Sequence, residues 1–152
     1  MSDSLRIAVL KEQANGETRV AVTPDMVRKF AKLGAKVAVE QGAGLDASIS
    51  DADFAAAGAL VGAADFAVQS ADIVLCVQGP DPDLLEGVKP GAWVVGMLEP
   101  FGERGRIDAY AKAGLEAMAM EWMPRITRAQ SMDVLSSQSN LAGYKAVIAA
   151  AD

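Results

Sequence analysis

The chain has 152 residues, of which 51% are apolar and 22% are charged, and its formal net charge is −6. This length predicts one domain with a sizeable core, and the negative charge argues against a general nucleic-acid surface, which needs clustered lysine and arginine. With no histidine and one cysteine, Cys76, the chain cannot build a Ser-His-Asp site, a Cys-His site or an internal disulfide, and we expect no metal site.

The N-terminal residues show no basic and then apolar leader, and no apolar run approaches the roughly 18 residues that a membrane helix requires. We therefore expect neither a secretory signal nor a membrane span. Cys76 lies inside the apolar run of residues 73–77, so we interpret it as a small buried hydrophobe in a protein of a reducing, cytoplasmic compartment.

Apolar runs alternate with helix-spaced apolar residues along the chain. The runs predict buried strands over residues 6–10, 36–40, 73–77, 92–97 and 115–120. Helices are predicted over residues 24–33, 51–57, 63–70, 104–113 and 141–151, with a short helix from Pro82. Thr23 before Pro24, and Ser50 three residues before Asp53, are typical helix starts. The alternation predicts an α/β fold: a Rossmann-like or flavodoxin-like three-layer domain with a mostly parallel sheet and helices on both faces.

Residues 42–47, GAGLDA, match the glycine-rich dinucleotide pattern with alanine in the last place. A pyrophosphate-binding loop of this kind opens directly into a helix, whose N-terminus meets the phosphate. Here residues 48–50 intervene, and the helix start is better placed at Ser50. We therefore interpret residues 42–47 as an ordinary glycine-rich loop.

Residues 121–140, EWMPRITRAQSMDVLSSQSN, are unusually polar. They follow the predicted strand 115–120, and a polar segment beyond the carboxyl end of a strand is where open parallel sheets bind ligands. We predict a ligand-binding loop here, followed by a helix that begins near Leu141 with Ser139 or Asn140 as its cap. The residues alone leave open another interpretation, in which Arg125 and Asp133 form a solvated ion pair and the serines cap a helix.

The run MPRITRAQSMDVLSSQSNLAGYKAVI, residues 123–148, resembles the signature of the α subunit of the proton-translocating NAD(P) transhydrogenases. The run KEQANGETRVAVTP, residues 11–24, is similar to the start that transhydrogenases share with alanine dehydrogenases. EQGAG at residues 40–44 and AME at residues 119–121 also fit. The resemblance covers essentially the whole chain.

In that family the resembling segment is the first half of the NAD(H)-binding component. We therefore expect residues 1–152 to form an alanine dehydrogenase/transhydrogenase N-terminal domain that ends before the Rossmann domain, which holds the adenine and pyrophosphate. The resemblance implies Si-/Re-specific, proton-translocating NAD(P)+ transhydrogenase activity within a complex, with NAD(H) on this component and NADP(H) on a partner. Because the phosphate-holding half is missing, we expect the isolated chain to be inactive and to bind NAD(H) weakly or not at all.

The resemblance also implies partners and a location. These are a homodimer of the NAD(H)-binding component, NADP(H)-binding and membrane components, and a cytoplasmic position at the inner face of a bacterial membrane, held there by the other subunits. It implies no nucleic-acid partner.

Carried onto this sequence, the resemblance implies catalytic roles for Arg125, Gln130 and Asp133. Arg125 would contact the nicotinamide side of NAD(H), and Gln130 would reach toward the partner's NADP(H). Asp133 and Ser136 would orient the nicotinamide amide, with Ile126 and Thr127 in the same wall. Hydride transfer between two nicotinamides needs no proton at the reacting carbons, which is consistent with the absence of histidine.

Two alternatives belong to other functional classes. Alanine dehydrogenases place an arginine where Arg19 stands, but also a lysine and a histidine where this chain has residues 77–80 (VQGP) and 97–100 (MLEP). The missing lysine and histidine argue against an amino-acid dehydrogenase, and the residues alone favour Arg19 as a surface cation before a capped helix. The second alternative is a flavodoxin-like module that binds a nucleotide or a protein and catalyses nothing.

Overall fold

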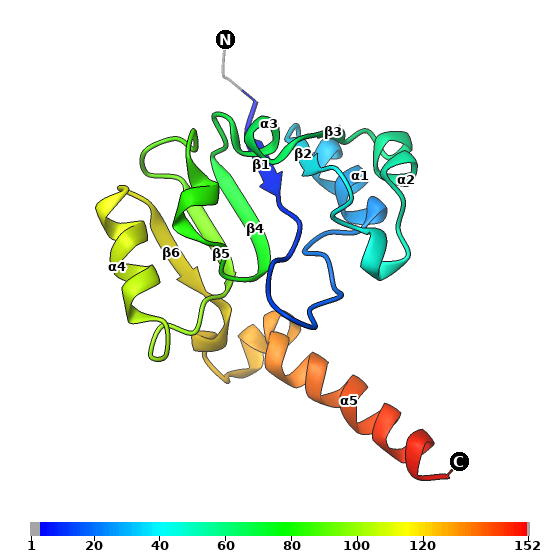
Figure 1. Cartoon of the computed structure of the whole chain (residues 1–152). Coiled ribbons are helices and arrows are strands. Elements are labelled where there is room, and N and C mark those ends of the chain that lie inside the picture. Colours follow the sequence, from blue (N-terminus) through cyan, green and yellow to red (C-terminus); the bar gives the residue numbers. More distant parts are fainter. Residues whose placement is uncertain (1–3, 152) are drawn as a thin grey trace.

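The computed structural model describes residues 4–151 and contains one six-stranded sheet (Figure 1). The strands lie in the order β3-β2-β1-β4-β5-β6, and every neighbouring pair is parallel. They are β1 (Arg6–Val9), β2 (Lys36–Glu40), β3 (Leu60–Gly62), β4 (Ile73–Gln78), β5 (Trp93–Met97) and β6 (Glu116–Ala119). The strands β1 to β3 follow one another toward one edge of the sheet. The chain then crosses back to place β4 on the other side of β1, as in doubly wound α/β folds. The predicted α/β fold is confirmed, and the sheet is parallel throughout.

One face of the sheet is covered by α1 (Pro24–Lys32) and α2 (Asp51–Ala56). Val27 of α1 and Phe54 of α2 are fully buried against Val9 and Val39. The predicted helix starts are confirmed, because the Thr23 side chain accepts from the Met26 backbone N–H and Ser50 forms a capping box with Asp53. Each cap satisfies backbone donors that a helix N-terminus leaves free.

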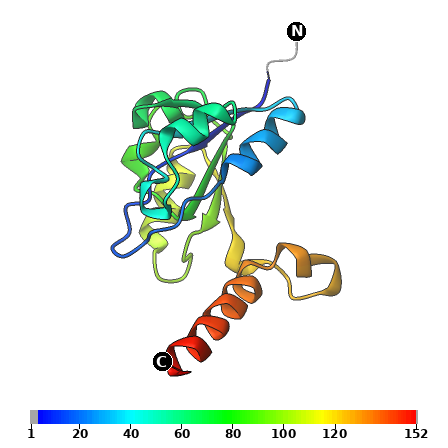
Figure 2. The same cartoon turned by 90° about the vertical axis from the view of Figure 1, so that its right-hand side faces the viewer.

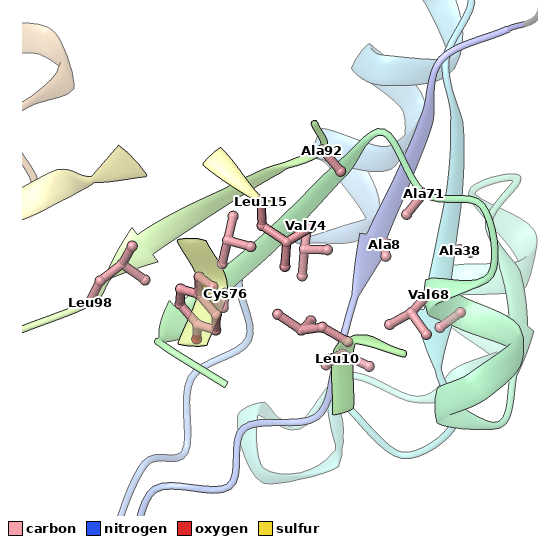
Figure 3. Packing of buried hydrophobic residues seen from close by; sticks show 14 residues of the cluster. Ala8, Leu10, Ala38, Val68, Ala71, Val74, Cys76, Ala92, Leu98 and Leu115 are labelled. Atoms are coloured by element: carbon pink, nitrogen blue, oxygen red, sulfur yellow. The ribbon is translucent and has the colours of Figure 1, made fainter. Parts of the chain in front are cut away.

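The other face is covered by α3 (Ala64–Val68), the 3₁₀ turn η2 (Pro82–Leu85) and α4 (Arg104–Lys112). Figure 3 shows Val68 of α3 near Ala8 and Ala38 of the sheet, and Val74 and Cys76 on the strand β4. Tyr110 of α4 is fully buried in the same cluster, and its hydroxyl donates to the Pro80 carbonyl. Alternate residues of each strand face opposite layers, so β1 supplies both clusters.

The glycine-rich residues 42–47 form a turn and the short 3₁₀ turn η1 (Leu45–Ala47) before the capped start of α2. Gly44 has no room for a side chain, because an added Cβ would lie 2.7 Å from the Ile49 carbonyl oxygen and from the Phe54 ring. The loop is therefore packed against its own following helix. Our interpretation of residues 42–47 as a structural loop agrees with this packing.

Three sequence expectations differ from the structure. The sequence does not predict the strand β3, because this strand has only three residues and lies at the edge of the sheet. The run 115–120 was expected to be buried, but β6 is the opposite edge strand and Glu116, Ala117 and Met118 are exposed. The last helix, α5 (Val134–Ala151), begins seven residues before the predicted Leu141. It extends away from the sheet with no buried residue (Figures 1 and 2).

Candidate functional site

Six residues line one hollow of about 250 Å³ just after β6: Arg125, Ile126, Thr127, Gln130, Asp133 and Ser136. They are the same residues for which the resemblance implies contact with the nicotinamide. Most are exposed, Ile126 to 56%, and Asp133 is half-buried. The structure thus brings all six together on one concave surface. The chemistry of the set is a guanidinium, an amide, a carboxylate and two hydroxyls around one apolar side chain.

The polar segment was predicted as a loop, and most of it is helical. It consists of the 3₁₀ turns η3 (Met120–Trp122) and η4 (Thr127–Met132), followed by α5. The cap of α5 is Asp133, whose Oδ1 accepts from the backbone N–H groups of Leu135 and Ser136 at 3.1 and 3.2 Å. The predicted caps Ser139 and Asn140 lie inside the helix. Hydroxyls here remain exposed, so the helix does not have to bury them.

Asp133 is ionised at neutral pH. The Ser136 hydroxyl donates to Asp133 Oδ2 at 2.6 Å, and this bond is the main cause of the lowered pKa of Asp133. The backbone N–H groups of Ser136 and Leu135 and the charge of Arg125 lower the pKa further. No ion pair within 4 Å joins Arg125 and Asp133 in residues 4–151. A carboxylate of this kind accepts hydrogen bonds and is a poor general acid near pH 7.

The start of the polar segment is attached to the end of β5. Glu121 accepts from the backbone N–H groups of Leu98 and Glu99, just beyond β5, at 3.2 and 2.6 Å. Beside it, the rings of Phe101 and Trp122 lie 5.6 Å apart at 52°. The site therefore begins at the carboxyl ends of β5 and β6, as parallel sheets favour.

A second, larger cavity of about 740 Å³ lies where the sheet order reverses, beyond the ends of β1 and β4. Its wall carries three carboxylates, Asp81, Glu99 and Glu103, and the guanidinium of Arg106, which donates to the Leu98 carbonyl at 3.1 Å. An anionic substrate would meet mainly like charges here. Gln78, Gly79 and Glu99, which lie in the two segments where the resemblance implies a lysine and a histidine for alanine dehydrogenases, thus line an acidic crevice.

Sequence reasoning missed a group of contacts centred on Arg19. Its guanidinium binds both carboxylate oxygens of Glu17 at 2.6–2.7 Å, and its Nη1 donates to Gln138 Oε1 at 3.1 Å. Glu12 accepts from the backbone N–H groups of Val77 and Gln78 at the end of β4. The long-range partners in this group are 61 to 119 residues apart in sequence. No local pattern could have indicated them.

Cys76 is inert. The residue is 8% exposed, its thiol donates to the Val95 carbonyl at 3.3 Å, and burial raises the pKa of the thiol to about 12. At pH 8 about one thiol in ten thousand is then a thiolate, so alkylation should be very slow in the folded protein. We expect iodoacetamide at pH 8 to leave Cys76 unmodified by mass spectrometry in buffer and to modify it fully in denaturant. Rapid labelling of the folded protein would contradict this.

Within residues 4–151, the structure has no group of three or more His, Cys, Asp or Glu side chains arranged to hold a metal ion. Over the same residues, no helix combines the length and apolar character that a membrane crossing requires.

The fold and the hollow define a doubly wound α/β domain with a concave polar surface at the carboxyl edge of its sheet, the edge where such folds commonly bind ligands. The family model described as "Alanine dehydrogenase/PNT, N-terminal domain" matches residues 8–142. The chain belongs to this family.

Two comparisons lie on the transhydrogenase side of the family. The first part of the NAD(P) transhydrogenase subunit alpha of Rhodospirillum rubrum is 48% identical over 95% of this chain and 39% of its own length. A transhydrogenase structure from Sinorhizobium meliloti is 49% identical, with a TM-score of 0.90 over 96% of this chain and 44% of that chain.

Alanine dehydrogenases are more distant. The enzyme of Mycobacterium tuberculosis is 34% identical over 91% of this chain and 37% of its own length. An L-alanine dehydrogenase structure has a TM-score of 0.69 at 32% identity, over 77% of this chain and 32% of that chain. The chain therefore spans less than half the length of each of these relatives. The predicted resemblance to the transhydrogenase α subunit is confirmed.

Proposed function

We propose that residues 1–152 form the N-terminal part of the NAD(H)-binding subunit of a proton-translocating, Si-/Re-specific NAD(P)+ transhydrogenase. The observation that carries the proposal is the hollow beyond β6, where six donors, acceptors and apolar groups converge. The similarity to transhydrogenase subunits supports it over almost the whole chain.

The hollow offers what a nicotinamide carboxamide requires, which is donors and acceptors together. Asp133, ionised and fixed by Ser136, accepts from the amide NH₂, and Arg125 donates to polar atoms on the same side. Gln130 has both a donor and an acceptor and is exposed, so it can face NADP(H) on the partner component. Ile126 and Thr127 complete the wall.

The bound nicotinamides supply hydride chemistry, and the side chains supply orientation. No group in the hollow has to move a proton, because hydride transfer between two nicotinamides needs none at the reacting carbons. The lowered pKa of Asp133 keeps its carboxylate ionised as a hydrogen-bond acceptor. Catalysis would come from holding the ring in place and excluding water. We propose that the rest of the nucleotide binds to a separate Rossmann domain, so that residues 1–152 alone bind NAD(H) weakly and are inactive. We also propose a homodimer held at the inner membrane face by NADP(H)-binding and membrane components.

The test is hydride transfer from NADH to an oxidised NADP(H) analogue. The full-length subunit would be mixed with the NADP(H)-binding component, and L-alanine with NAD+ would be tested in parallel. We expect transfer between nucleotides and no alanine turnover. Alanine turnover would show that the acidic crevice around Asp81 and Glu99 has been misinterpreted. Absence of both activities would leave a binding module.

A further inference from the structure

The placement of α5 depends on few contacts within residues 4–151. The helix has 18 residues and none is buried, and only Val134 and Leu135 at its start are half-buried. Figure 2 shows it leaving the body of the domain. Among the described residues, the side-chain hydrogen bonds that join residues 121–151 to the rest of the chain are those of Glu121 to β5 and of Arg19 to Gln138. Packing within residues 4–151 therefore does not fix the direction of α5.

The contact from Arg19 is preorganised. Glu17 holds the guanidinium through two hydrogen bonds, and Gln78 at the end of β4 donates to the same carboxylate at 3.3 Å. The Glu17 side chain is only 8% exposed, and the hydrogen bond from Arg19 is the main cause of the lowering of the pKa of Glu17 to about 2. The ion pair is thus present throughout the neutral range. The Glu17 carboxylate neutralises the charge of the Arg19 guanidinium, so Arg19 is poorly suited to capture an anionic ligand.

Arg19 and Gln138 also line one cavity of about 320 Å³ together with Val134. Gln138 lies two residues after Ser136 and five after Asp133, on the same helix. Fixing Gln138 therefore restricts the rotation of the first turns of α5, which carry the Asp133–Ser136 side of the hollow.

We propose that Arg19 is a positioning residue for hydride transfer: through Gln138 it ties the start of α5 to the loop after β1 and so sets the orientation of Asp133 and Ser136. This inference rests on the proposed function. Arg19 does not touch the hollow itself. Its effect on the reaction is indirect.

The test uses the full-length subunit with its NADP(H)-binding component and the variants Arg19→Met, Gln138→Leu and the double variant. Misplacing an orienting group by a fraction of an ångström should lower kcat for hydride transfer about tenfold. The KM for NADH should change less, because the adenine and pyrophosphate are held elsewhere. The double variant should be no slower than Arg19→Met, because both substitutions break the same contact between Arg19 and Gln138. Amide hydrogen exchange over residues 134–140 should be faster in each of these three variants than in the wild type.

Two variants separate positioning from general stability. Gln138→Glu keeps an acceptor for Arg19 and should retain nearly the wild-type rate. Arg28→Met removes an arginine that pairs with Asp25 on α1, a helix that does not carry α5. It should change neither kcat nor the amide hydrogen exchange of residues 134–140. Gln138 is exposed, so its variants should fold even if Arg19→Met, which leaves Glu17 unpaired, does not.

Wild-type kcat in Gln138→Leu, with unchanged exchange over residues 134–140, would overturn the inference. So would additive losses in the double variant, or a Gln138→Glu variant as slow as Gln138→Leu. If the wild-type subunit transfers no hydride, the proposed function fails and the role of Arg19 in the reaction fails with it. An active wild type with an active Gln138→Leu variant refutes the role of Arg19 alone.

Discussion

Replacing Asp133 with asparagine should lower hydride transfer by about 10- to 100-fold and leave the subunit folded, because in the proposed function the carboxylate orients the nicotinamide. Asparagine is as good a helix cap as aspartate, so the start of α5 keeps its backbone partners. What changes is the charge and the second acceptor oxygen, which binds the Ser136 hydroxyl. The measurements are single-turnover transfer from NADH and the melting temperature of the same preparation.

Asp133→Ala removes the cap as well and should lower the melting temperature by roughly 2–4 °C. The matched control is Ser50→Ala, which removes the cap of α2 with a similar effect but lies outside the hollow. Arg125→Ala should resemble Asp133→Asn, with a large loss of rate and little loss of stability. A Ser50→Ala subunit as slow as Asp133→Ala, or a fast Asp133→Asn subunit, would return Asp133 to a purely structural role.

Much of the fold was predictable because its signals are local. Each of these signals spans only a few residues. They are the helix caps Thr23 and Ser50 and the apolar runs of β1, β2, β4 and β5. The misassigned elements are those whose state depends on what lies beside them. The run 115–120 has the composition of a buried strand, yet β6 has a neighbour on one side only.

The start of α5 was misplaced for a related reason. Polar composition predicts a loop, but an exposed helix tolerates hydroxyls at Ser136, Ser137 and Ser139. The cap that starts the helix is Asp133, for which the sequence predicts a ligand contact or an ion pair with Arg125 instead.

Polar composition predicts a ligand-binding segment at residues 121–140, whereas the individual site residues follow from the resemblance and not from spacing. Residue spacing does not reveal that Arg125 and Ser136 line one hollow, because a 3₁₀ turn and the first turn of a helix bring them together. The contact of Arg19 with Gln138 spans 119 positions. Only the folded chain places the loop after β1 beside the start of α5.

Gly96→Ala should be a strongly destabilising single-methyl change in the sheet. An added Cβ would lie 2.5 Å from Cys76 Sγ and 2.6 Å from the Cys76 carbonyl oxygen, so β4 and β5 would have to separate. Overpacking of this kind costs about 1–3 kcal/mol, which for about 150 residues lowers the melting temperature by roughly 2–4 °C per kcal/mol. Urea unfolding followed by tryptophan fluorescence would measure the loss.

The clash has two parts, and they can be separated. Cys76→Ala in the Gly96→Ala background removes the sulfur but not the carbonyl oxygen, so only part of the stability should return. Gly105→Ala in α4 is the control, because nothing lies within 4 Å of its added Cβ. It should be neutral or slightly stabilising, by up to about 1 kcal/mol, since alanine favours helix over glycine. Equal unfolding midpoints for Gly96→Ala and wild type would contradict the close approach of β4 and β5.

The Gly96 change should also reach the candidate site. Gly96 lies two residues before Leu98, whose backbone N–H, with that of Glu99, binds the Glu121 carboxylate at the start of the polar segment. A shift of β5 away from β4 would therefore move Glu121 and, with it, the beginning of the hollow. We expect the hydride transfer of folded Gly96→Ala to fall even below its melting temperature, whereas Ser50→Ala should lose stability without losing rate. The close approach of β4 and β5 at Gly96 thus lies next to the strand end to which the polar segment is attached.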